Sequence, residues 1–295
     1  VYLMSYFKAS AQHLFYAYSR DGKTWTDING SRPVFNAYDD EVWLRDPYLH
    51  RVTHNGKTKF HLIHTWGWDH PALFHWESDD LIHWTAANGG TRTDDGKIML
   101  MDGHDGGPVS PNAWAPEFTY DGQTGTFYLY WSSRIGDRQV HHYCTTKDWL
   151  TFSTPAVYFD PGFTAIDMTI LKEGDTYYAY YKDERNGEKT IRCATSKSLD
   201  PRVQRFEGST PLLPSRYIEV EGPEVFPAMG GKGWFLYFDK FNGDRGVSYT
   251  GCTDPSQHKW YPIPDDEIRN PTEVKHGSVE IISTAELEKL LEHFK

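Results

Sequence analysis

Several features are scarce in this sequence of 295 residues. It has three cysteines, an odd number that gives no fully paired disulfide framework. No apolar run approaches the ~18 residues that a membrane-spanning helix needs. Positive charge is outnumbered, with 30 Lys and Arg against 41 Asp and Glu and a net charge of −11. These absences argue against a disulfide scaffold, a membrane span, and nucleic acid or an anionic membrane as the partner.

The chain begins VYLMSYF, without an initiator methionine or a basic leader. We therefore expect an exported protein, periplasmic or extracellular, whose signal segment is not part of this chain.

A short turn motif recurs along the chain. SRDGKTW at 19–25 is repeated as SDDLIHW at 78–84 and TKDWLTF at 146–152, with looser copies at 198–206 and 253–260. In each copy an Asp side chain can accept hydrogen bonds from backbone amides ahead of it, and the aromatic side chain can fold back as a plug. The closing aromatics lie at 25, 84, 152, 206 and 260, so the repeat is about fifty to seventy residues long.

Each turn follows a strand-like run of aromatic and β-branched residues, and a second such run lies about a hairpin's length earlier. Repeats of this length, each a small antiparallel sheet, predict a five-bladed β-propeller that forms a single all-β domain over residues 1–295. The three cysteines fall on the strand before the turn in three successive repeats, so we expect them to be buried: Cys144, Cys193 and Cys252.

The two ends of the chain are predicted to close the ring. The first repeat lacks an innermost strand, whereas the strand-like segment at 275–282 has no repeat of its own, so it would complete the N-terminal blade. Ser283 and Glu286 then form a capping box. Apolar residues recur behind it at helical spacing, which predicts an amphipathic helix over about 284–294 that packs on the outside.

The segment 86–112, rich in Gly and Asp, is the longest irregular stretch. We expect it at a rim of the propeller, where such loops often shape a binding site. Its DGHDGG lacks the spacing of a calcium-binding EF-hand loop, which favours a solvated loop.

Ionisable residues recur where the innermost strand of each repeat begins, in RDPYLH, WAPEFT, IDMTIL, EGPEVF and HGSVEI. In a propeller these entrances face one central funnel, so their side chains should converge: Asp46, Glu117, Asp167, Glu221, Glu224 and His276. Because an unpaired buried carboxylate is costly, several on one axis indicate a joint function. The alternative is a set of structural ion pairs with basic residues such as Arg45 or Arg192.

In this order and spacing, RDPYL, WAPEF, AIDMTI, VEGPEVF and HGSV resemble glycoside hydrolase family 43, from about Leu14 to the last strand. The resemblance implies a five-bladed propeller that cleaves arabinose- and xylose-containing plant polysaccharides by an inverting mechanism with three carboxylates. Carried over by motif, Asp46 would be the general base, Glu221 the general acid, and Asp167 the residue that tunes the pKa of the acid. Base and acid would stand roughly 6.5–9.5 Å apart, leaving room for a water. Glu224, three residues beyond Glu221 on an extended strand, would face the other way.

Aromatic residues near these motifs are candidates for sugar binding. Trp114 is the best platform for the C–H face of a sugar ring, although packing between blades would also explain it. Trp66 and Trp68, in HTWGWDH, would wall the sugar pocket, and Glu117 would have a supporting role. Asp183 and Glu184, in YKDER, lie at the far end of a second strand and are expected to be solvated.

The resemblance also implies a structural calcium near the propeller axis, held by His276 through water, with no cofactor required for the chemistry. The alternative for His276 is a core histidine whose hydrogen bonds are satisfied. The other histidines show no chelating pattern, because His61 and His64 should point to opposite faces of their strand, as should His141 and His142.

With this resemblance, we expect an exo-acting α-L-arabinofuranosidase, a monomer that acts on plant cell-wall oligo- or polysaccharide. β-Xylosidase activity is the alternative within the same chemistry, and a non-catalytic carbohydrate-binding propeller is the alternative of another class. A sialidase is disfavoured, because the axial positions offer acids rather than a Tyr nucleophile and an Arg cluster.

Overall fold

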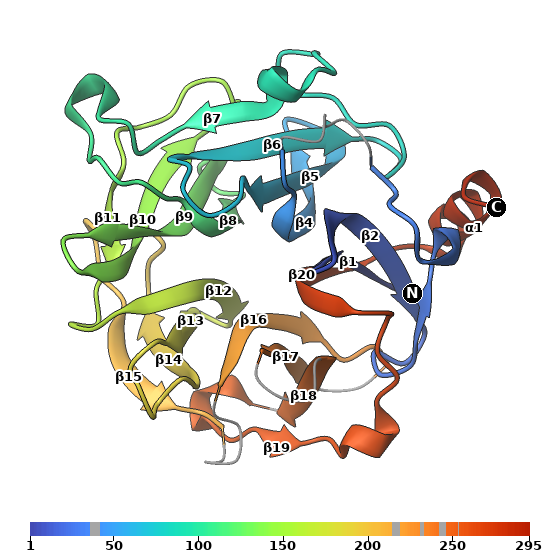
Figure 1. Cartoon of the computed structure of the whole chain (residues 1–295). Helices are drawn as coiled ribbons and strands as arrows, with labels where there is room; N and C mark the ends of the chain where they lie inside the picture. The colour runs from blue at the N-terminus through green and yellow to red at the C-terminus, as the bar shows by residue number, and fades with distance from the viewer. Residues whose placement is uncertain (36–41, 214–218, 231–232, 242–245, 253) are drawn as a thin grey trace.

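The structure, a computed structural model, describes residues 1–35, 42–213, 219–230, 233–241, 246–252 and 254–295, with the backbone alone at 246–252. The described strands form five four-stranded antiparallel sheets arranged around a central axis (Figure 1). One α-helix lies near the C-terminus. The predicted all-β propeller with a short C-terminal helix is confirmed.

The strands of each sheet follow one another from the axis outward. The first three sheets in chain order are β20 (Val274–Ile281) with β1 (Tyr2–Lys8), β2 (Ala11–Ser19) and β3 (Trp25–Asp27); β4 (Arg45–His54), β5 (Lys57–Thr65), β6 (Ala72–Ser78) and β7 (Lys97–Met99); and β8 (Trp114–Asp121), β9 (Thr126–Ile135), β10 (Arg138–Thr146) and β11 (Ala156–Phe159). The other two are β12 (Ala165–Glu173), β13 (Thr176–Asp183), β14 (Ile191–Ser196) and β15 (Glu207–Pro211); and β16 (Val220–Pro227), β17 (Trp234–Lys240), β18 (Gly246–Cys252) and β19 (Tyr261–Pro262).

The five ionisable motifs begin the five innermost strands. β4, β8, β12, β16 and β20 each contact the innermost strand of the next sheet, so together they form a ring around the axis. Because all five run in the same direction along the axis, their first residues gather at one end of the central channel and their later residues at the other.

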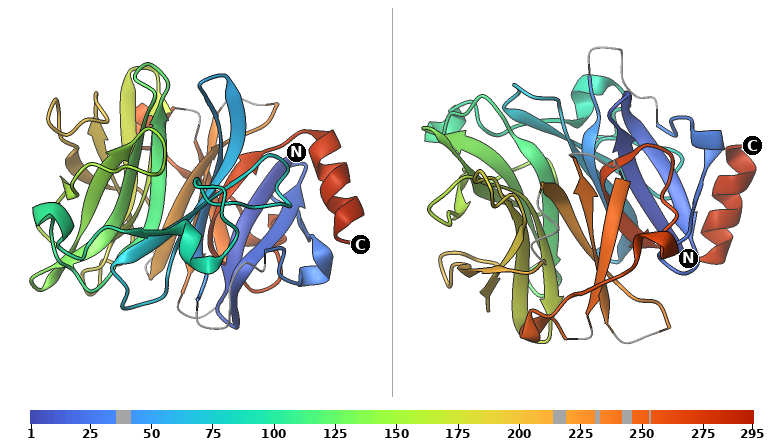
Figure 2. Two further views of the ribbon diagram at one scale, coloured as in Figure 1. Left: turned by 90° about the horizontal axis from the view of Figure 1, so that it is seen from above. Right: turned by 60° about the horizontal axis from the view of Figure 1, so that its bottom comes forward.

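The ring is closed as the sequence predicts. β20 pairs antiparallel with β1, with Met4 opposite Val279, and so completes the N-terminal sheet. The helix α1 (Thr284–His293) follows on the outside of this sheet (Figure 2). Ser283 caps it, because its side chain accepts from the backbone N–H of Glu286 while the Glu286 carboxylate reaches back to Ser283. Leu287 and Leu290 are buried in the adjoining core.

The recurring turn is built by the same hydrogen bonds in successive sheets. The Ser19 hydroxyl accepts from Gly22 N at 2.9 Å, and one Asp21 oxygen accepts from Lys23 N and Thr24 N at 2.8 and 2.7 Å. Ser78 with Asp80 and Thr146 with Asp148 repeat this pattern. The buried hydrophobic side chains of the described residues form five clusters, each filled from two neighbouring sheets.

Two expectations about particular segments have mixed outcomes. Cys144 and Cys193 are buried free thiols as predicted, whereas the side chain of Cys252 lies outside the described residues. The segment 86–112 is not only a rim loop, because its residues 97–99 form β7, the outermost strand of the second sheet, beside two short 3-10 turns, η2 (Thr93–Gly96) and η3 (His104–Gly106). Three further 3-10 turns are η1 (Asn29–Ser31), η4 (Pro255–Gln257) and η5 (Asp265–Glu267). Within the described chain, α1 is too short to cross a bilayer, and no other helix qualifies.

Candidate active site

A shared backbone irregularity positions the side chains at the channel entrance. The second residue of each motif on β4, β8, β12 and β16 has a left-handed backbone, with φ of 47°, 44°, 52° and 58° at Asp46, Ala115, Asp167 and Gly222. The strand register shifts at each of these places. Such a conformation is unfavourable for residues other than Gly and is tolerated best by Asp and Asn. Its recurrence marks one structural device, a bulge that interrupts strand pairing at the mouth of the channel.

The bulged ends surround a pocket of about 250 Å³. Asp46 from β4, Asp167 from β12 and Glu221 from β16 all line it, so the three carboxylates assigned by the resemblance are brought together from three sheets. The other described residues that line it are Phe7, Arg45, Thr65, Gly67, Trp68, Trp114, Ile166, Lys182, Glu184, Lys189, Phe241 and His276.

Asp46 is held as a carboxylate. Its Oδ2 accepts a hydrogen bond from the Thr65 hydroxyl at 2.8 Å, and its Oδ1 lies 3.5 Å from Nδ1 of His276. Burial alone would raise the pKa of Asp46, but the His276 contact, the charge of Arg45 and the Thr65 hydrogen bond together bring it below its usual value. Asp46 is therefore ionised at neutral pH.

Asp167 is in a different state. It is buried, and its Oδ2 accepts from the backbone N–H of Gly222 at 3.0 Å, which ties it to the strand that carries Glu221. Burial raises the pKa of Asp167 to about 6, and the charges of Glu221 and Asp46 add to this, whereas His276 and Lys182 oppose it. Two neighbouring acids of this pocket therefore differ in their affinity for a proton.

Glu221 contacts a lysine that the sequence reasoning missed. Lys182 Nζ donates to Glu221 Oε2 at 2.8 Å, also pairs with Glu184, and lies 4.2 Å from the centre of the Phe241 ring. β13 pairs antiparallel with β12 so that Lys182 stands opposite Ile166. The end of this second strand therefore returns to the mouth of the pocket, and antiparallel pairing is the signal that could have located Lys182 and Glu184.

The YKDER segment is consequently less solvated than expected. Glu184 lines the pocket, and Asp183 is fully buried, where it accepts from Arg192 at 2.6 Å and from Arg185 at 2.7 Å. Asp183 is thus a structural ion-pair partner rather than a solvated charge.

Two of the three predicted tryptophans line the pocket. Trp68 and Trp114 meet edge to face with ring centres 5.7 Å apart, and Trp114 Nε1 donates to the Trp68 carbonyl at 2.7 Å. The Arg45 guanidinium lies 4.2 Å from the centre of the Trp68 ring. Trp68 remains 51% exposed, so part of an aromatic surface is free for a ligand.

Trp66 lies outside this pocket. Its ring stacks on His70 with centres 3.9 Å apart and is covered by Lys97 at 4.4 Å. Gly67, with φ of +75°, turns the chain between Trp66 and Trp68, so the two rings do not share a face as an extended strand would require.

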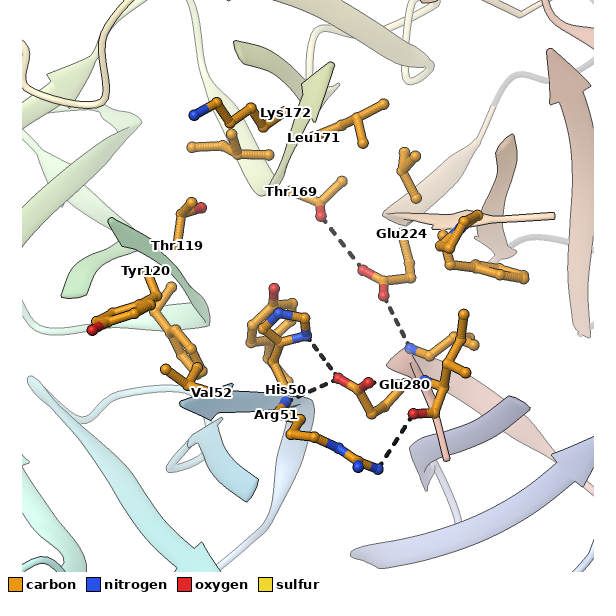
Figure 3. Close-up of a pocket in the computed structure, with 18 of the residues that line it drawn as sticks. His50, Arg51, Val52, Thr119, Tyr120, Thr169, Leu171, Lys172, Glu224 and Glu280 are labelled. Carbon is orange, nitrogen blue, oxygen red and sulfur yellow. Dashed lines mark hydrogen bonds and ion pairs between the residues drawn. The ribbon is translucent and has the colours of Figure 1, made fainter. Parts of the chain in front are cut away.

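Glu117 is also outside the pocket, deeper along the axis. Glu117 and Glu224 are both buried, and the Thr169 hydroxyl donates to Glu224 Oε2 at 3.4 Å (Figure 3). Tyr130 donates to Glu117 at 3.3 Å, and Val279 N donates to Glu224 Oε1 at 2.9 Å. Burial and the charge of Glu224 raise the pKa of Glu117 well above its usual value. Burial likewise raises the pKa of Glu224 to about 7.

Glu224 and Glu221 both face the channel and open toward different ends of it. The expectation that Glu224 would face the other way is wrong, because the strand register shifts between the two residues and breaks the alternation of an extended strand. Glu224 lines a second pocket of about 510 Å³, together with later residues of the five innermost strands, such as His50 and Glu280. None of the three carboxylates at the mouth contributes to it.

His276 is surrounded by acids. Burial disfavours its charge, but the contact with Asp46 and the charges of Asp167, Asp46 and Glu221 together raise the pKa of His276 to about 9. Its ring also packs on Gly222, where an added Cβ would come within 2.6 Å of it.

This environment does not fit calcium. Calcium takes roughly six to eight oxygen ligands, whereas Oδ1 of Asp46 faces a ring nitrogen, Nδ1 of His276, at 3.5 Å. Among the described residues that line the pocket, four are acidic and four are basic: Asp46, Asp167, Glu184, Glu221, Arg45, Lys182, Lys189 and His276.

Comparison with known proteins gives a consistent match. Residues 1–288 match the family described as a probable glycosyl hydrolase domain, a relative of family 43. An α-L-arabinofuranosidase of Bifidobacterium longum subsp. longum is 27% identical over 249 residues, which cover 68% of this chain and 22% of that protein. The chain thus spans about a fifth of the length of this relative.

Solved structures share the fold. A family 43 β-1,3-galactosidase is 13% identical with a TM-score of 0.63, over 89% of this chain and 55% of that one. A Bacteroides ovatus family 43 protein of a xyloglucan PUL is 18% identical with a TM-score of 0.57, and the match covers 81% of this chain and 43% of that one. A thermostable family 43 glycoside hydrolase is 20% identical with a TM-score of 0.54, and the match covers 74% of this chain and 71% of that one. At these identities the likeness concerns the fold alone.

Proposed function

Because this chain belongs to the glycosidases related to glycoside hydrolase family 43, which hydrolyse glycosidic bonds, we propose that it is an inverting, exo-acting α-L-arabinofuranosidase. The proposal depends on one observation above all, that Asp46, Asp167 and Glu221 line a single pocket from three different sheets. Its substrate would be the arabinose-bearing side chains of plant cell-wall polysaccharides, and the protein would act as an exported monomer.

We assign the general base to Asp46. Its low pKa keeps it ionised, so it can take a proton from a water molecule in the pocket. As the O–H bond of that water breaks, its oxygen attacks the anomeric carbon from the face opposite the leaving group. The product then has the inverted configuration.

We assign the general acid to Glu221. As the glycosidic C–O bond breaks, Glu221 would give its proton to the departing oxygen, which leaves as an alcohol. Asp167, which accepts from the Gly222 N–H on the strand of Glu221, would be the residue that tunes and positions this acid. Lys182 orients the Glu221 carboxyl group through its hydrogen bond to Oε2.

The size and walls of the pocket favour a single sugar unit. Its volume of about 250 Å³ is below the range of roughly 300–1,000 Å³ typical of sites for drug-sized ligands. Trp68 and Trp114 offer aromatic surface to the C–H face of a sugar ring. The choice of arabinose follows the name of the Bifidobacterium relative, and β-xylosidase activity is the second candidate.

A panel of aryl glycosides tests the proposal: α-L-arabinofuranoside, β-D-xyloside and β-D-galactoside, each followed by proton NMR from the first minute. We expect the arabinofuranoside to be cleaved fastest, with β-arabinofuranose as the first product. Faster cleavage of another glycoside would replace the sugar assignment, and first release of the α-anomer from the arabinofuranoside would overturn the inverting mechanism.

We also infer that the pocket works without a divalent cation. Treatment with EGTA, followed by return of Ca²⁺, should leave kcat/KM unchanged. Loss of activity with EGTA and its recovery with Ca²⁺ would contradict this inference.

A further inference from the structure

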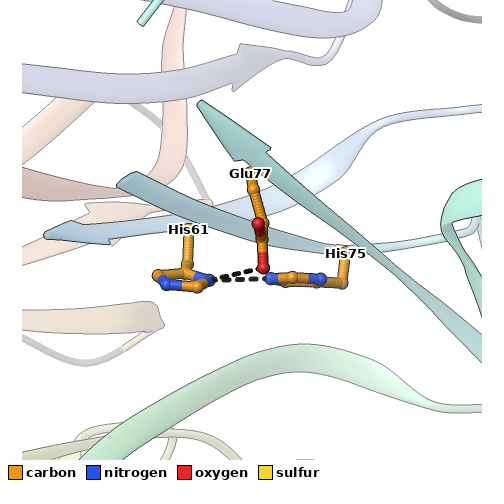
Figure 4. A group of neighbouring side chains, drawn as sticks. All are labelled: His61, His75 and Glu77. Atoms are coloured by element: carbon orange, nitrogen blue, oxygen red, sulfur yellow. Dashed lines mark hydrogen bonds and ion pairs between the residues drawn. The ribbon is translucent and has the colours of Figure 1, made fainter. Parts of the chain in front are cut away.

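Two histidines and a glutamate meet on the second sheet, away from the pocket described above. His61 on β5 lies directly opposite Glu77 on β6, and His75 is two residues before Glu77 on the same strand face. Figure 4 shows the three side chains pointing toward one another. His61 Nδ1 is 3.0 Å from His75 Nε2 and 4.0 Å from Glu77 Oε1.

These distances suit a transition-metal ion. The three ligand atoms all lie within 4.8 Å of one another. Zinc bonds nitrogen at ~2.0–2.1 Å and carboxylate oxygen at ~2.0–2.2 Å, so tetrahedral ligand atoms stand about 3.3–3.5 Å apart. Small side-chain rotations would bring these three atoms to that spacing. In the described part of the chain, this is the only group of three or more His, Cys, Asp or Glu residues with ligand atoms so close.

The ligand atoms are available and held in place. A 3.0 Å contact between two ring nitrogens requires one of them to accept, so a lone pair already faces the other ring. Both rings are buried, and His75 stacks on Trp149 at 3.6 Å with an angle of 2° between the planes. This packing orients the imidazoles before any metal binds, which lowers the cost of binding.

The cluster is open on one side. His61, Glu77 and Trp149 line a pocket of about 340 Å³, which offers an entry path and space for a water as a fourth ligand. Lys59 Nζ lies 2.9 Å from Glu77 Oε2. It therefore orients the carboxylate, leaves Oε1 toward His61, and adds a positive charge that weakens binding of a cation.

We propose that His61, His75 and Glu77 form a binding site for zinc or a similar divalent transition metal. The ion would link β5 to β6. The site is separate from the residues assigned to glycoside hydrolysis, so its test is independent of the proposed function.

Isothermal titration of ZnCl2 into the untagged, chelator-treated chain is the experiment, together with the absorption spectrum of the Co²⁺-loaded chain. We expect one zinc per chain and the intense visible bands of tetrahedral Co²⁺. His61→Gln and Glu77→Gln should each weaken binding by more than about 100-fold, because loss of an outer contact alone typically costs 10–100-fold. Lys59→Met should tighten it by about tenfold, because a nearby positive charge is removed.

His83→Gln is the matched control. The exposed His83 ring lies near the His293 ring, with ring centres 6.0 Å apart, so the two histidines offer a rival zinc site on the surface. It should leave binding unchanged. No stoichiometric zinc, or binding that is lost in His83→Gln and retained in His61→Gln, would overturn the proposal. If His61→Gln does not fold, the Co²⁺ spectrum of the unaltered chain decides, because only weak octahedral bands would refute the site.

Discussion

The variant His276→Gln tests how Asp46 is kept ionised. In the structure Nδ1 of His276 stands 3.5 Å from Oδ1 of Asp46, and the two side chains are only 10% and 13% exposed. The surrounding acids outweigh burial and raise the pKa of His276 to about 9, which favours its charged form at neutral pH. Glutamine keeps a hydrogen-bond donor of similar reach but carries no charge. The change therefore removes the electrostatic part of the contact. Burial, which raises the pKa of Asp46, is then opposed less strongly, so that pKa should rise.

The size of the effect follows from the distance. Two unit charges 3.5 Å apart attract by about 4–5 kcal/mol at an effective dielectric constant of ~20. Since 1.36 kcal/mol corresponds to one pKa unit, the upper bound is about three units. Arg45 and Thr65 remain, and water can enter the space left by the ring, so we expect the pKa of Asp46 to rise by about 1–2 units.

The assay is kcat/KM against pH from about 4 to 9 with the best aryl glycoside. A general base must be ionised, so the acidic limb of the profile should move to higher pH by the same ~1–2 units. His50→Gln is the control, because His50 pairs with Glu280 at the other end of the channel at 2.8 Å. An acidic limb that stays in place in His276→Gln, or moves equally in His50→Gln, would refute the reasoning.

Three further outcomes are expected. Glu221→Gln should reduce turnover of glycosides with poor leaving groups by about 10²–10⁴-fold and of activated aryl glycosides far less; equal losses on both would contradict an acid role. Trp114→Ala should raise KM by about tenfold, as expected for loss of an aromatic contact. Trp66→Ala, outside the pocket, should leave KM unchanged. If the Trp114→Ala variant had the same KM as the unaltered protein, Trp114 would not belong to the binding surface. Glu224 has a folded pKa of about 7 against 4.5, so the folded state loses stability as pH rises from about 4.5 to 7, by up to about 3 kcal/mol. Glu224→Gln should therefore raise Tm at pH 8 and hardly change it at pH 4.5. An equal or lower Tm at pH 8 would argue against a free-energy cost of ionising the buried Glu224.

Features carried by a local pattern could be predicted from the sequence. The Asp-containing turn and the motif at each channel entrance have local hydrogen-bonding or backbone causes, so they recur in order and locate the innermost strands. Ring closure followed from an unpaired strand pattern at each end, and the capping box gave the start of α1.

Contacts across strands and between sheets could not be predicted in this way. The role of Lys182 depends on the antiparallel pairing that sets it opposite Ile166. The contact between His61 and His75 was missed, because the two residues lie on neighbouring strands and the alternation along one strand compares His61 only with His64. Trp66 was misplaced because one glycine with positive φ breaks the alternation of a strand.

The central claim is that Asp46 takes the proton from the attacking water in the pocket it shares with Glu221. The direct measurement is kcat of Asp46→Asn on the preferred aryl glycoside, with Tm and calorimetric binding of the released sugar as checks that the pocket is intact. We predict unchanged sugar binding and a fall in kcat of about 10²–10⁴-fold. A variant that binds sugar normally and turns over within a few-fold of the unaltered enzyme would contradict the account.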